Sequence, residues 1–214
     1  MYIQITTRCQ MKCAHCCMSA TRKGEDMTWE TFKAAVAYEE GGYVSLGGGE
    51  PTLHPQFEKF LFYAIGKCES VWLATNGGIT DTALVLAKMA QNGIIAVDLS
   101  LDPWHDAIDP KVVEAFTRTV DHAPDDARDI RRVSGNVIRQ GRAARRSFSE
   151  WEEAKDGCVC EDFFVKPDGT VHQCGCPKSP CIGDVFKGWK GLEDRFGNHD
   201  MGCHKTCKKS AKVA

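Results

Sequence analysis

Residues 9–17 read Cys-Gln-Met-Lys-Cys-Ala-His-Cys-Cys, and the rest of the chain is organised around this stretch. Three of its thiols, Cys9, Cys13 and Cys16, have the spacing C-x3-C-x2-C, which lets a short loop wrap around one corner of a cubane iron–sulfur cluster. Three thiolates leave one iron of a [4Fe–4S] cluster open, and an open coordination position distinguishes a catalytic metal site from a closed structural one. The stretch therefore predicts a catalytic cluster.

Two other uses of cysteine fit this stretch less well. A zinc knuckle would show paired C-x2-C units some distance apart, and a disulfide framework would follow a secretory signal peptide. Residues 1–6 are too short for the apolar region of a signal peptide, and they lead directly into the cysteines.

Composition limits the class of protein. A length of 214 residues predicts one large domain, or one domain with a small appendage. The hydrophobic fraction of 43% and the charged fraction of 26% are typical of a globular protein with a sizeable core. A formal net charge of -2 argues against a nucleic-acid partner, and no apolar run is long enough to cross a bilayer, which argues against a membrane partner.

The cysteines are unevenly spread. Twelve of them without an export signal indicate the cytoplasm, where thiols stay reduced and bind metals. Four lie in the opening loop and seven between Cys158 and Cys207, while Cys68 stands alone and is interpreted as a small buried hydrophobe. This distribution predicts two metal-bearing zones, a core of residues 1–146 and a cysteine-rich domain of residues 147–214.

Short apolar or alternating runs predict strands, each followed by an unusual polar, glycine-rich or cysteine-rich loop. We expect strands at residues 2–6, 43–46, 71–74, 94–99 and 133–139. Helical periodicity predicts helices from an N-cap at Thr28, over residues 55–66, from a cap at Thr80-Asp81 to residue 92, and over residues 111–122. Parallel α/β folds gather the loops that follow their strands on one face. We therefore predict an α/β fold, an open, partial TIM-like (β/α) barrel of about five to six parallel strands with all these loops in one site.

The loop after the second expected strand carries a family resemblance. Gly48-Gly49-Glu50-Pro51, in register behind the C-x3-C-x2-C loop, resembles radical S-adenosylmethionine (SAM) enzymes over residues 2–140. In that family SAM chelates the open iron, and the reduced cluster cleaves SAM to methionine and a 5′-deoxyadenosyl radical, which abstracts a substrate hydrogen atom. The resemblance thus implies an enzyme with a [4Fe–4S] cluster and SAM as cofactors.

The resemblance also implies roles for individual residues. The cluster ligands would be Cys9, Cys13 and Cys16. The implied SAM contacts are Gly48, Gly49 and Glu50 for the methionine amino group, and Asn76, Ser100 and Asp102 for the ribose or the methionine carboxylate. Glycines allow a close approach of backbone groups, and a carboxylate pairs with an ammonium.

Two residues inside the opening loop have no role in the motif. Cys17 stands where many members of the family have an aromatic residue, and it is interpreted as a small apolar filler, a substrate contact or a spurious ligand. His15 is interpreted as a packing or hydrogen-bonding residue.

The tail after residue 141 contains a predicted hairpin. Lys166-Pro167-Asp168-Gly169 separates two alternating runs, and a strand-like run at residues 182–185 and a helix near residues 189–196 follow. With its terminal cysteine pair, this tail is similar to the auxiliary domains called Twitch and SPASM, and it implies a second iron–sulfur cluster. The implied ligands are Cys160, Cys174, Cys203 and Cys207, with Cys158, Cys176 and Cys181 in surplus. A zinc site built from the same thiols is the alternative.

Candidates for chemistry on the substrate are His105 and Cys17. Trp104-His105-Asp106 follows the fourth expected strand, on the face of the predicted site, where His105 is either an acid or base or a hydrogen-bonded loop residue. An arginine-dense stretch is either a solvated surface or a contact for an anionic substrate. Its members are Arg128, Arg131, Arg132, Arg139, Arg142, Arg145 and Arg146.

We therefore expect a radical SAM enzyme that modifies a peptide or that oxidises or rearranges a small molecule. Such an enzyme needs an electron donor such as flavodoxin or ferredoxin, and a partner protein presents the substrate if that substrate is a peptide. The competing hypothesis is a non-enzymatic iron–sulfur redox sensor or a zinc-stapled binding module, neither of which has a use for Gly48-Gly49-Glu50 in register with the cysteines.

Overall fold

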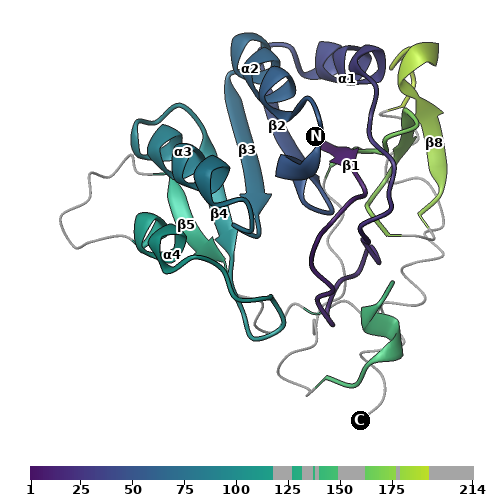
Figure 1. Ribbon diagram of the computed structural model, residues 1–214. Helices are drawn as coiled ribbons and strands as arrows, with labels where there is room; N and C mark the ends of the chain where they lie inside the picture. Colours follow the sequence, from purple (N-terminus) through teal and green to yellow (C-terminus); the bar gives the residue numbers. More distant parts are fainter. Residues whose placement is uncertain (118–126, 132–136, 138–139, 149–161, 177–178, 193–214) are drawn as a thin grey trace.

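The computed structural model describes residues 1–117, 127–131, 137, 140–148, 162–176 and 179–192, which form one mixed sheet with helices beside it (Figure 1). The strands are β1 (Tyr2–Thr6), β2 (Tyr43–Gly48), β3 (Ser70–Thr75), β4 (Ala96–Ser100), β5 (Arg128–Arg131), β6 (Phe164–Val165), β7 (Thr170–His172) and β8 (Cys181–Asp184). The α-helices are α1 (Trp29–Val36), α2 (Phe57–Lys67), α3 (Thr80–Gln91) and α4 (Pro110–Phe116). Short 3-10 helices are η1 (Ala37–Glu39), η2 (Pro51–Leu53), η3 (Ala143–Arg145) and η4 (Val185–Lys187).

The sheet has the order β5-β4-β3-β2-β1-β6-β7-β8. Strands β1 to β5 are parallel, with Tyr2 opposite Ser45 and Trp72 opposite Ala96 as examples of the register. Helices α1 to α4 connect these strands, as parallel neighbours require. Because β5 and β8 end the described sheet on opposite sides, it is open, and the predicted open α/β fold is confirmed.

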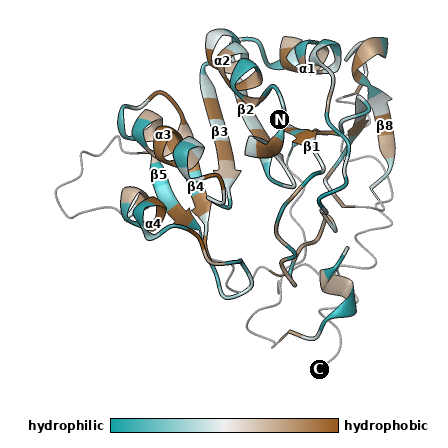
Figure 2. Ribbon diagram, in the orientation of Figure 1, coloured by the Kyte–Doolittle hydropathy of each residue, from teal (hydrophilic) through white to brown (hydrophobic). Residues whose placement is uncertain are grey.

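The helices form where the sequence predicts amphipathic segments, and Figure 2 shows apolar and polar residues side by side on them. Thr28 caps α1 as predicted, since its hydroxyl accepts a hydrogen bond from the backbone N–H of Thr31 at 3.2 Å. The buried rings of Phe32 in α1 and Phe60 in α2 stack with centroids 4.2 Å apart. Burying each ring stabilises the fold by about 1.5–3 kcal/mol. None of the helices in the described part of the chain is both long and apolar enough to cross a bilayer.

The structure contains one parallel strand that the sequence did not predict. It is β5, Arg128–Arg131, which the arginine-dense composition concealed. Of the predicted strand at residues 133–139, only Val137 lies among the described residues, where it is buried. Charged side chains are common on edge strands, and they erase the apolar pattern that predicts a strand.

Several element ends also differ. β4 begins at Ala96, and Ile94 is 49% exposed, so the run is not buried on both faces throughout. In α3 the N-cap is Ile79, without a side-chain cap, so Thr80 is the first helical residue. α4 ends at Phe116, and the predicted extension over residues 118–122 lies outside the described residues. Residues 189–192 form a turn, while 193–196 are not described.

The tail extends the same sheet. β6 and β7 form the predicted antiparallel hairpin, with Phe164 opposite His172, and the N–H of Gly169 closes the turn on the carbonyl of Lys166 at 2.9 Å. β6 also pairs in parallel with β1, with Tyr2 opposite Phe164. The two predicted zones therefore share one sheet, and the domain boundary after residue 146 stays a prediction.

Candidate functional site

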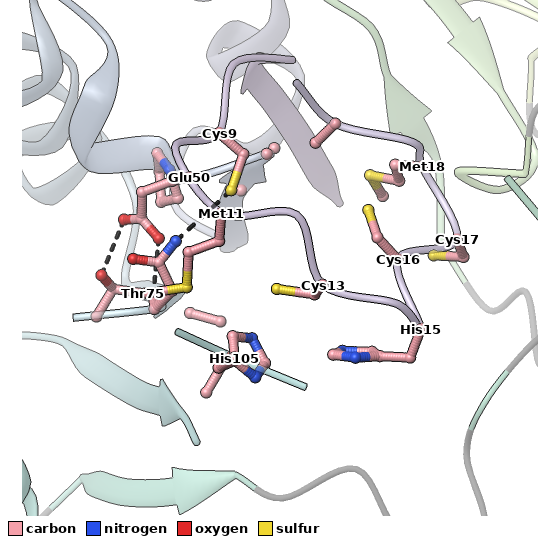
Figure 3. Close-up of a pocket in the computed structure, with 18 of the residues that line it drawn as sticks. Cys9, Met11, Cys13, His15, Cys16, Cys17, Met18, Glu50, Thr75 and His105 are labelled. Carbon is pink, nitrogen blue, oxygen red and sulfur yellow. Dashed lines mark hydrogen bonds between the residues drawn. The ribbon is translucent and has the colours of Figure 1, made fainter. Parts of the chain in front are cut away.

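The carboxyl ends of β1 to β4 meet at one cavity of about 320 Å³ (Figure 3). The predicted site residues that line it are Cys9, Cys13, Cys16, Cys17, Gly48, Gly49, Glu50, Asn76, Ser100 and His105. Asp102 lies outside this lining, whereas Arg131 and Arg142 from the arginine-dense stretch contribute to it. Tyr2, which sequence reasoning did not single out, also lines the cavity, and burial raises its pKa to about 12.

The glycine loop, residues 48–50, lies directly on the start of the cysteine loop, residues 9–17. The N–H of Gly49 donates to the carbonyl of Thr6 at 2.9 Å, and the N–H of Glu50 donates to that of Arg8 at 2.8 Å. Gly48 has φ 153°, and a Cβ there would lie 2.0 Å from the Thr6 carbonyl oxygen. Glycine is therefore required, because only its bare backbone allows the two loops to meet at this distance.

The three predicted cluster ligands are free thiols around one cavity. Cys9 and Cys13 are buried, with 7% and 9% exposed, and Cys16 is half-buried. Burial raises the pKa of Cys9 to about 11, so the protein alone favours the neutral thiol. Metal coordination deprotonates a thiol and compensates its charge. The donor set, its spacing and the shared cavity fit a cluster bound by three thiolates.

Glu50 is buried beneath the glycine loop, with 1% of its surface exposed. Its Oε1 accepts from the backbone N–H and hydroxyl of Thr52 and from the hydroxyl of Thr75, at 3.3, 2.7 and 2.8 Å. Its Oε2 accepts from the backbone N–H of Asn76 at 2.7 Å. Burial still raises the pKa of Glu50, although these donors oppose the shift. Oε1 is fully used, so Oε2 is the oxygen with capacity for a further cation or donor.

Asn76 contacts a predicted cluster ligand. Its side-chain N–H groups donate to Sγ of Cys9 at 3.6 Å and to Oε1 of Gln10 at 3.4 Å. Its side-chain oxygen accepts from Nε2 of Gln10 at 2.8 Å and from the N–H of Gly78 at 2.9 Å. The amide that sequence reasoning assigned to SAM therefore has both hydrogens engaged within the protein. Gln10 was missed, although its place beside Cys9 inside the motif is a usable signal.

Asp102, whose contact with SAM stays a prediction, lies between two histidines. Its Oδ1 is 2.9 Å from Nδ1 of His105 and accepts from the N–H of Trp104 at 2.9 Å, and its Oδ2 is 3.8 Å from Nε2 of His15. Burial alone would raise the pKa of Asp102, but the neighbouring imidazole of His105 and the hydrogen bond from Trp104 lower it below its ordinary value. The Asp102–His105 contact is an ion pair by distance rather than a well-aligned hydrogen bond, because His105 Nδ1 lacks a partner by hydrogen-bond geometry.

The two histidines of this group respond differently to their surroundings. Burial lowers the pKa of His15, and the charge of Asp102 only partly offsets this effect. Burial also acts against a charged His105, but the neighbouring Asp102 carboxylate and Cys13 thiol raise its pKa to about 9. His105 lines the cavity and is therefore an imidazole held beside a predicted cluster ligand.

Arg142 fastens the cysteine loop from a distant part of the chain. Its guanidinium donates to the carbonyl of Cys13 at 2.8 Å and to that of Ala20, and its backbone N–H donates to the carbonyl of Cys16 at 2.9 Å. Gly141 precedes it with φ 56°, and a Cβ there would lie 2.1 Å from the Cys17 carbonyl oxygen. Residues 141–142 therefore contact the cysteine loop directly, whereas the sequence indicated only a solvated surface or an anionic-substrate contact for Arg142.

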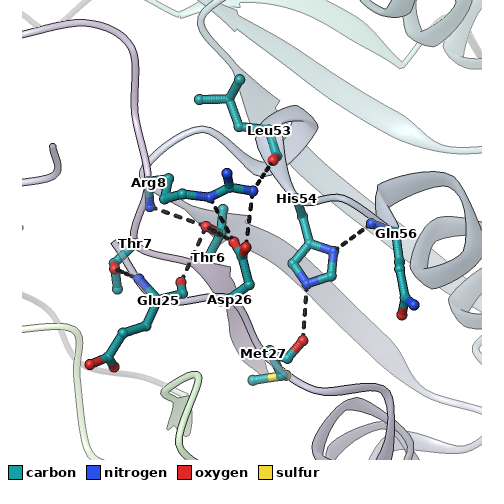
Figure 4. A network of polar contacts seen from close by, with 9 residues as sticks. All are labelled: Thr6, Thr7, Arg8, Glu25, Asp26, Met27, Leu53, His54 and Gln56. Atoms are coloured by element: carbon teal, nitrogen blue, oxygen red, sulfur yellow. Dashed lines mark hydrogen bonds and ion pairs between the residues drawn. The ribbon is translucent and has the colours of Figure 1, made fainter. Parts of the chain in front are cut away.

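A polar network supports the opposite, outer side of the same loop (Figure 4). The guanidinium of Arg8 pairs with the carboxylate of Asp26 through two contacts of 3.0 Å and donates to the carbonyl of Leu53. Nearby, Nδ1 of His54 accepts from the N–H of Gln56 at 3.0 Å. The proton of this imidazole therefore lies on Nε2, which donates to the carbonyl of Met27 at 3.0 Å.

Only part of the predicted tail site lies in the described chain. Cys174 and Cys176 are buried and Cys181 is exposed, whereas Cys158, Cys160, Cys203 and Cys207 lie outside the described residues. Between the two buried cysteines, a Cβ at Gly175 would lie 3.0 Å from the Cε of Met18, a residue of the cavity wall. The turn that holds Cys174 is therefore packed close to the cavity.

Comparison with known proteins agrees with this geometry. The family described as the Radical SAM superfamily matches residues 3–137. Mycofactocin maturase MftC of Mycobacterium ulcerans (strain Agy99) is 32% identical over 108 residues, which cover 46% of this chain and 28% of that protein. The antilisterial bacteriocin subtilosin biosynthesis protein AlbA of Bacillus subtilis (strain 168) is 33% identical over 104 residues, which cover 46% of this chain and 23% of that protein. The chain thus spans about a quarter of the length of these relatives.

A solved structure extends the likeness to the tail. Native anSMEcpe with bound AdoMet and Cp18Cys peptide superposes with a TM-score of 0.56 and 17% identity, over 99% of this chain and 83% of that one. At this identity the likeness concerns the fold alone.

Proposed function

Because the chain belongs to the radical SAM superfamily, we propose that it is an enzyme that abstracts a hydrogen atom from a peptide substrate. The observation that carries this proposal is the cavity in which three free thiols face the Gly48–Glu50 loop. The superfamily implies a [4Fe–4S] cluster and SAM, which when bound supply the 5′-deoxyadenosyl radical. The residues of the chain bind and orient these groups and exclude water.

The proposed assignment of residues follows the cavity. Cys9, Cys13 and Cys16 hold the cluster, and the exposed backbone of Gly48 and Gly49 receives SAM. Glu50 receives the methionine ammonium through Oε2, because its other oxygen is already saturated. Ser100 lines the cavity at the end of β4 and takes the ribose or the carboxylate.

A peptide is the favoured substrate class because two relatives are named for mycofactocin maturation and for biosynthesis of the bacteriocin subtilosin. A protein that presents the peptide and an electron donor of the flavodoxin or ferredoxin class are proposed partners, and the cytoplasm is the proposed location. A second iron–sulfur cluster on Cys160, Cys174, Cys203 and Cys207 is part of the same proposal. Its support is the burial of Cys174 beside the cavity.

Formation of 5′-deoxyadenosine tests the enzymatic function. The protein is reconstituted anaerobically with iron and sulfide, then incubated with dithionite and SAM, and the nucleoside is measured by chromatography. We expect 5′-deoxyadenosine from the wild type and none from the Cys9→Ala, Cys13→Ala, Cys16→Ala triple variant. A wild type with its iron bound but without this product would exclude the enzyme and leave the redox sensor.

Metal analysis of the same triple variant tests the second cluster. With the first site removed, about four irons per chain should remain, and Cys174→Ala in that background should abolish them. Zinc in place of iron would show that the tail holds a structural zinc site instead.

A further inference from the structure

His15, Asp102 and His105 form a half-buried polar group, and Figure 3 shows its two histidines beside Cys13. Their side chains are 15%, 1% and 9% exposed. The rings of His15 and His105 have centroids 5.1 Å apart, and Trp104 packs on His15 at the same distance. Figure 3 shows the ring of His15, which belongs to the cysteine loop, pointing toward His105.

This group has unsatisfied polar atoms. Among the described residues, Oδ2 of Asp102, Nδ1 of His15 and Nδ1 of His105 have no hydrogen-bond partner by geometry, although the last lies 2.9 Å from Oδ1 of Asp102. A buried polar atom without a partner costs about 1–3 kcal/mol, so a group that retains three such atoms is poorly explained by stability alone. A functional role of the group at the cavity that His105 lines would explain why this cost in stability is retained.

Asp102 determines which nitrogen of His105 faces the cavity. Nδ1 lies 2.9 Å from the carboxylate, so this nitrogen is the one directed at Asp102. His105 and Cys13 line the same cavity, where Figure 3 shows them beside each other, and Nε2 is the ring nitrogen that remains to face the thiol. A carboxylate that fixes the orientation of an imidazole is the arrangement that supports metal ligands in many sites.

We propose that Asp102 and His105 are positioning residues for the cluster, and that Nε2–H of His105 donates a hydrogen bond to the Cys13 thiolate and raises the reduction potential of the cluster. The inference rests on the proposed function, since it requires a cluster on Cys13. Hydrogen bonds to cluster sulfurs withdraw electron density and favour the reduced state. His105 would thus ease the transfer of one electron from an external donor to the cluster, with no change in bonding.

A divalent cation bound by these three residues is a different use of the same atoms. One ligand atom from each of His15, Asp102 and His105 lies within 4.8 Å of the others. In that case His105 would be a ligand, and its nitrogen would no longer be available to Cys13. The contact with Cys13 favours the hydrogen bond, and the experiment distinguishes the two arrangements.

The midpoint potential of the reconstituted cluster tests the proposal. It is measured without SAM by anaerobic potentiometric titration, with EPR of the reduced cluster as the readout and iron and sulfide content determined for each variant. We expect His105→Phe to shift the potential to lower values and Asp102→Asn to shift it in the same direction by less. His105→Gln retains an N–H donor, and it should stay closest to the wild type.

His54→Gln is the control, because it changes a buried histidine that does not line the cavity. Equal potentials in His105→Phe, Asp102→Asn and the wild type at full iron content would overturn the inference and leave the proposed function intact. If His105→Phe does not take up iron, the potentials of Asp102→Asn and His105→Gln are compared with that of the wild type. A lower potential for Asp102→Asn alone supports the proposal, and equal potentials in all three overturn it. A wild type that assembles no cluster would overturn both proposals. Stoichiometric zinc in the triple cysteine variant, lost on His105→Phe, would show the cation site instead.

Discussion

The two sides of the cavity are built in different ways. On the side of β1 to β3, the cysteine and glycine loops are joined by backbone hydrogen bonds, such as that from Gly49 N–H to Thr6. On the side of residues 141–142, the guanidinium of Arg142 adds side-chain bonds to the carbonyls of Cys13 and Ala20, beside a backbone bond to Cys16 and the close approach of Gly141. Both sides therefore require a glycine where two backbones meet, and the second also depends on one particular charged side chain.

Gly48→Ala should have the largest effect, because it inserts a Cβ where the two backbones meet. At φ 153° and 2.0 Å from the Thr6 carbonyl, it should lower the free energy of unfolding by at least about 2 kcal/mol. Gly41→Ala is the control, since Gly41 has φ 81° but open space around it, and about 1 kcal/mol is expected there. Urea unfolding measures both, and equal losses would show that the close approach is not required.

Arg142→Ala should have the next largest effect, because it leaves the carbonyls of Cys13 and Ala20 without their charged donor. We expect a loss of about 2 kcal/mol in unfolding free energy and faster release of iron to a chelator. Arg145→Ala removes an exposed arginine of η3 nearby and should change neither. Equal iron release from the two variants would contradict the role assigned to Arg142.

Thr75→Val should weaken SAM binding through Glu50. The substitution removes a hydroxyl donor at 2.8 Å from Oε1 while keeping the shape of the side chain. A loss of about 1 kcal/mol in the free energy of SAM binding corresponds to a roughly fivefold rise in the SAM dissociation constant. Equilibrium binding of SAM to the reconstituted protein measures it. Thr117→Val, at the end of α4, is the control and should bind SAM like the wild type.

The last prediction concerns the pH dependence of the unfolding free energy through His54, which lies near the Arg8–Asp26 pair (Figure 4). Burial lowers the pKa of His54 below 6.5 in the folded protein, so the unfolded chain binds more protons as the pH falls. The contribution of neutral His54 is thus fully present above pH 6.5 and is lost progressively below it, by at most about 1.4 kcal/mol per pH unit.

The measurement is the unfolding free energy of the wild type minus that of His54→Gln, at about pH 7.5 and pH 5. The difference between the two proteins isolates His54 from the other histidines. A difference that is independent of pH would contradict the neutral tautomer assigned here.

The first side of the cavity was largely predictable from the sequence, because its parts are local. C-x3-C-x2-C and Gly48-Gly49-Glu50 each follow directly after a strand, and parallel strand ends share a face. The hairpin at residues 166–169 was predictable for the same reason, since Pro-Asp-Gly determines its own turn.

The second side was only partly predictable. Arg142 acts on residues more than a hundred positions away, and one arginine among several carries no local signal of that contact. The family resemblance implied a SAM contact for Asp102, which stays a prediction, but it gave no indication that Asp102 lies beside His105. The three-residue spacing of Asp102 and His105 is a signal that could have indicated their contact.

The pairing of β6 with β1 has a consequence for folding. β1 begins the described chain and delivers the cysteine loop, yet one of its two neighbours, β6, lies near the other end of that chain. A contact between such distant segments forms late, because a large loop must close first. During synthesis β1 therefore keeps one unpaired edge until Phe164 and Val165 emerge, so the loop that holds Cys9 and Cys13 becomes anchored on both sides only when the tail has been made.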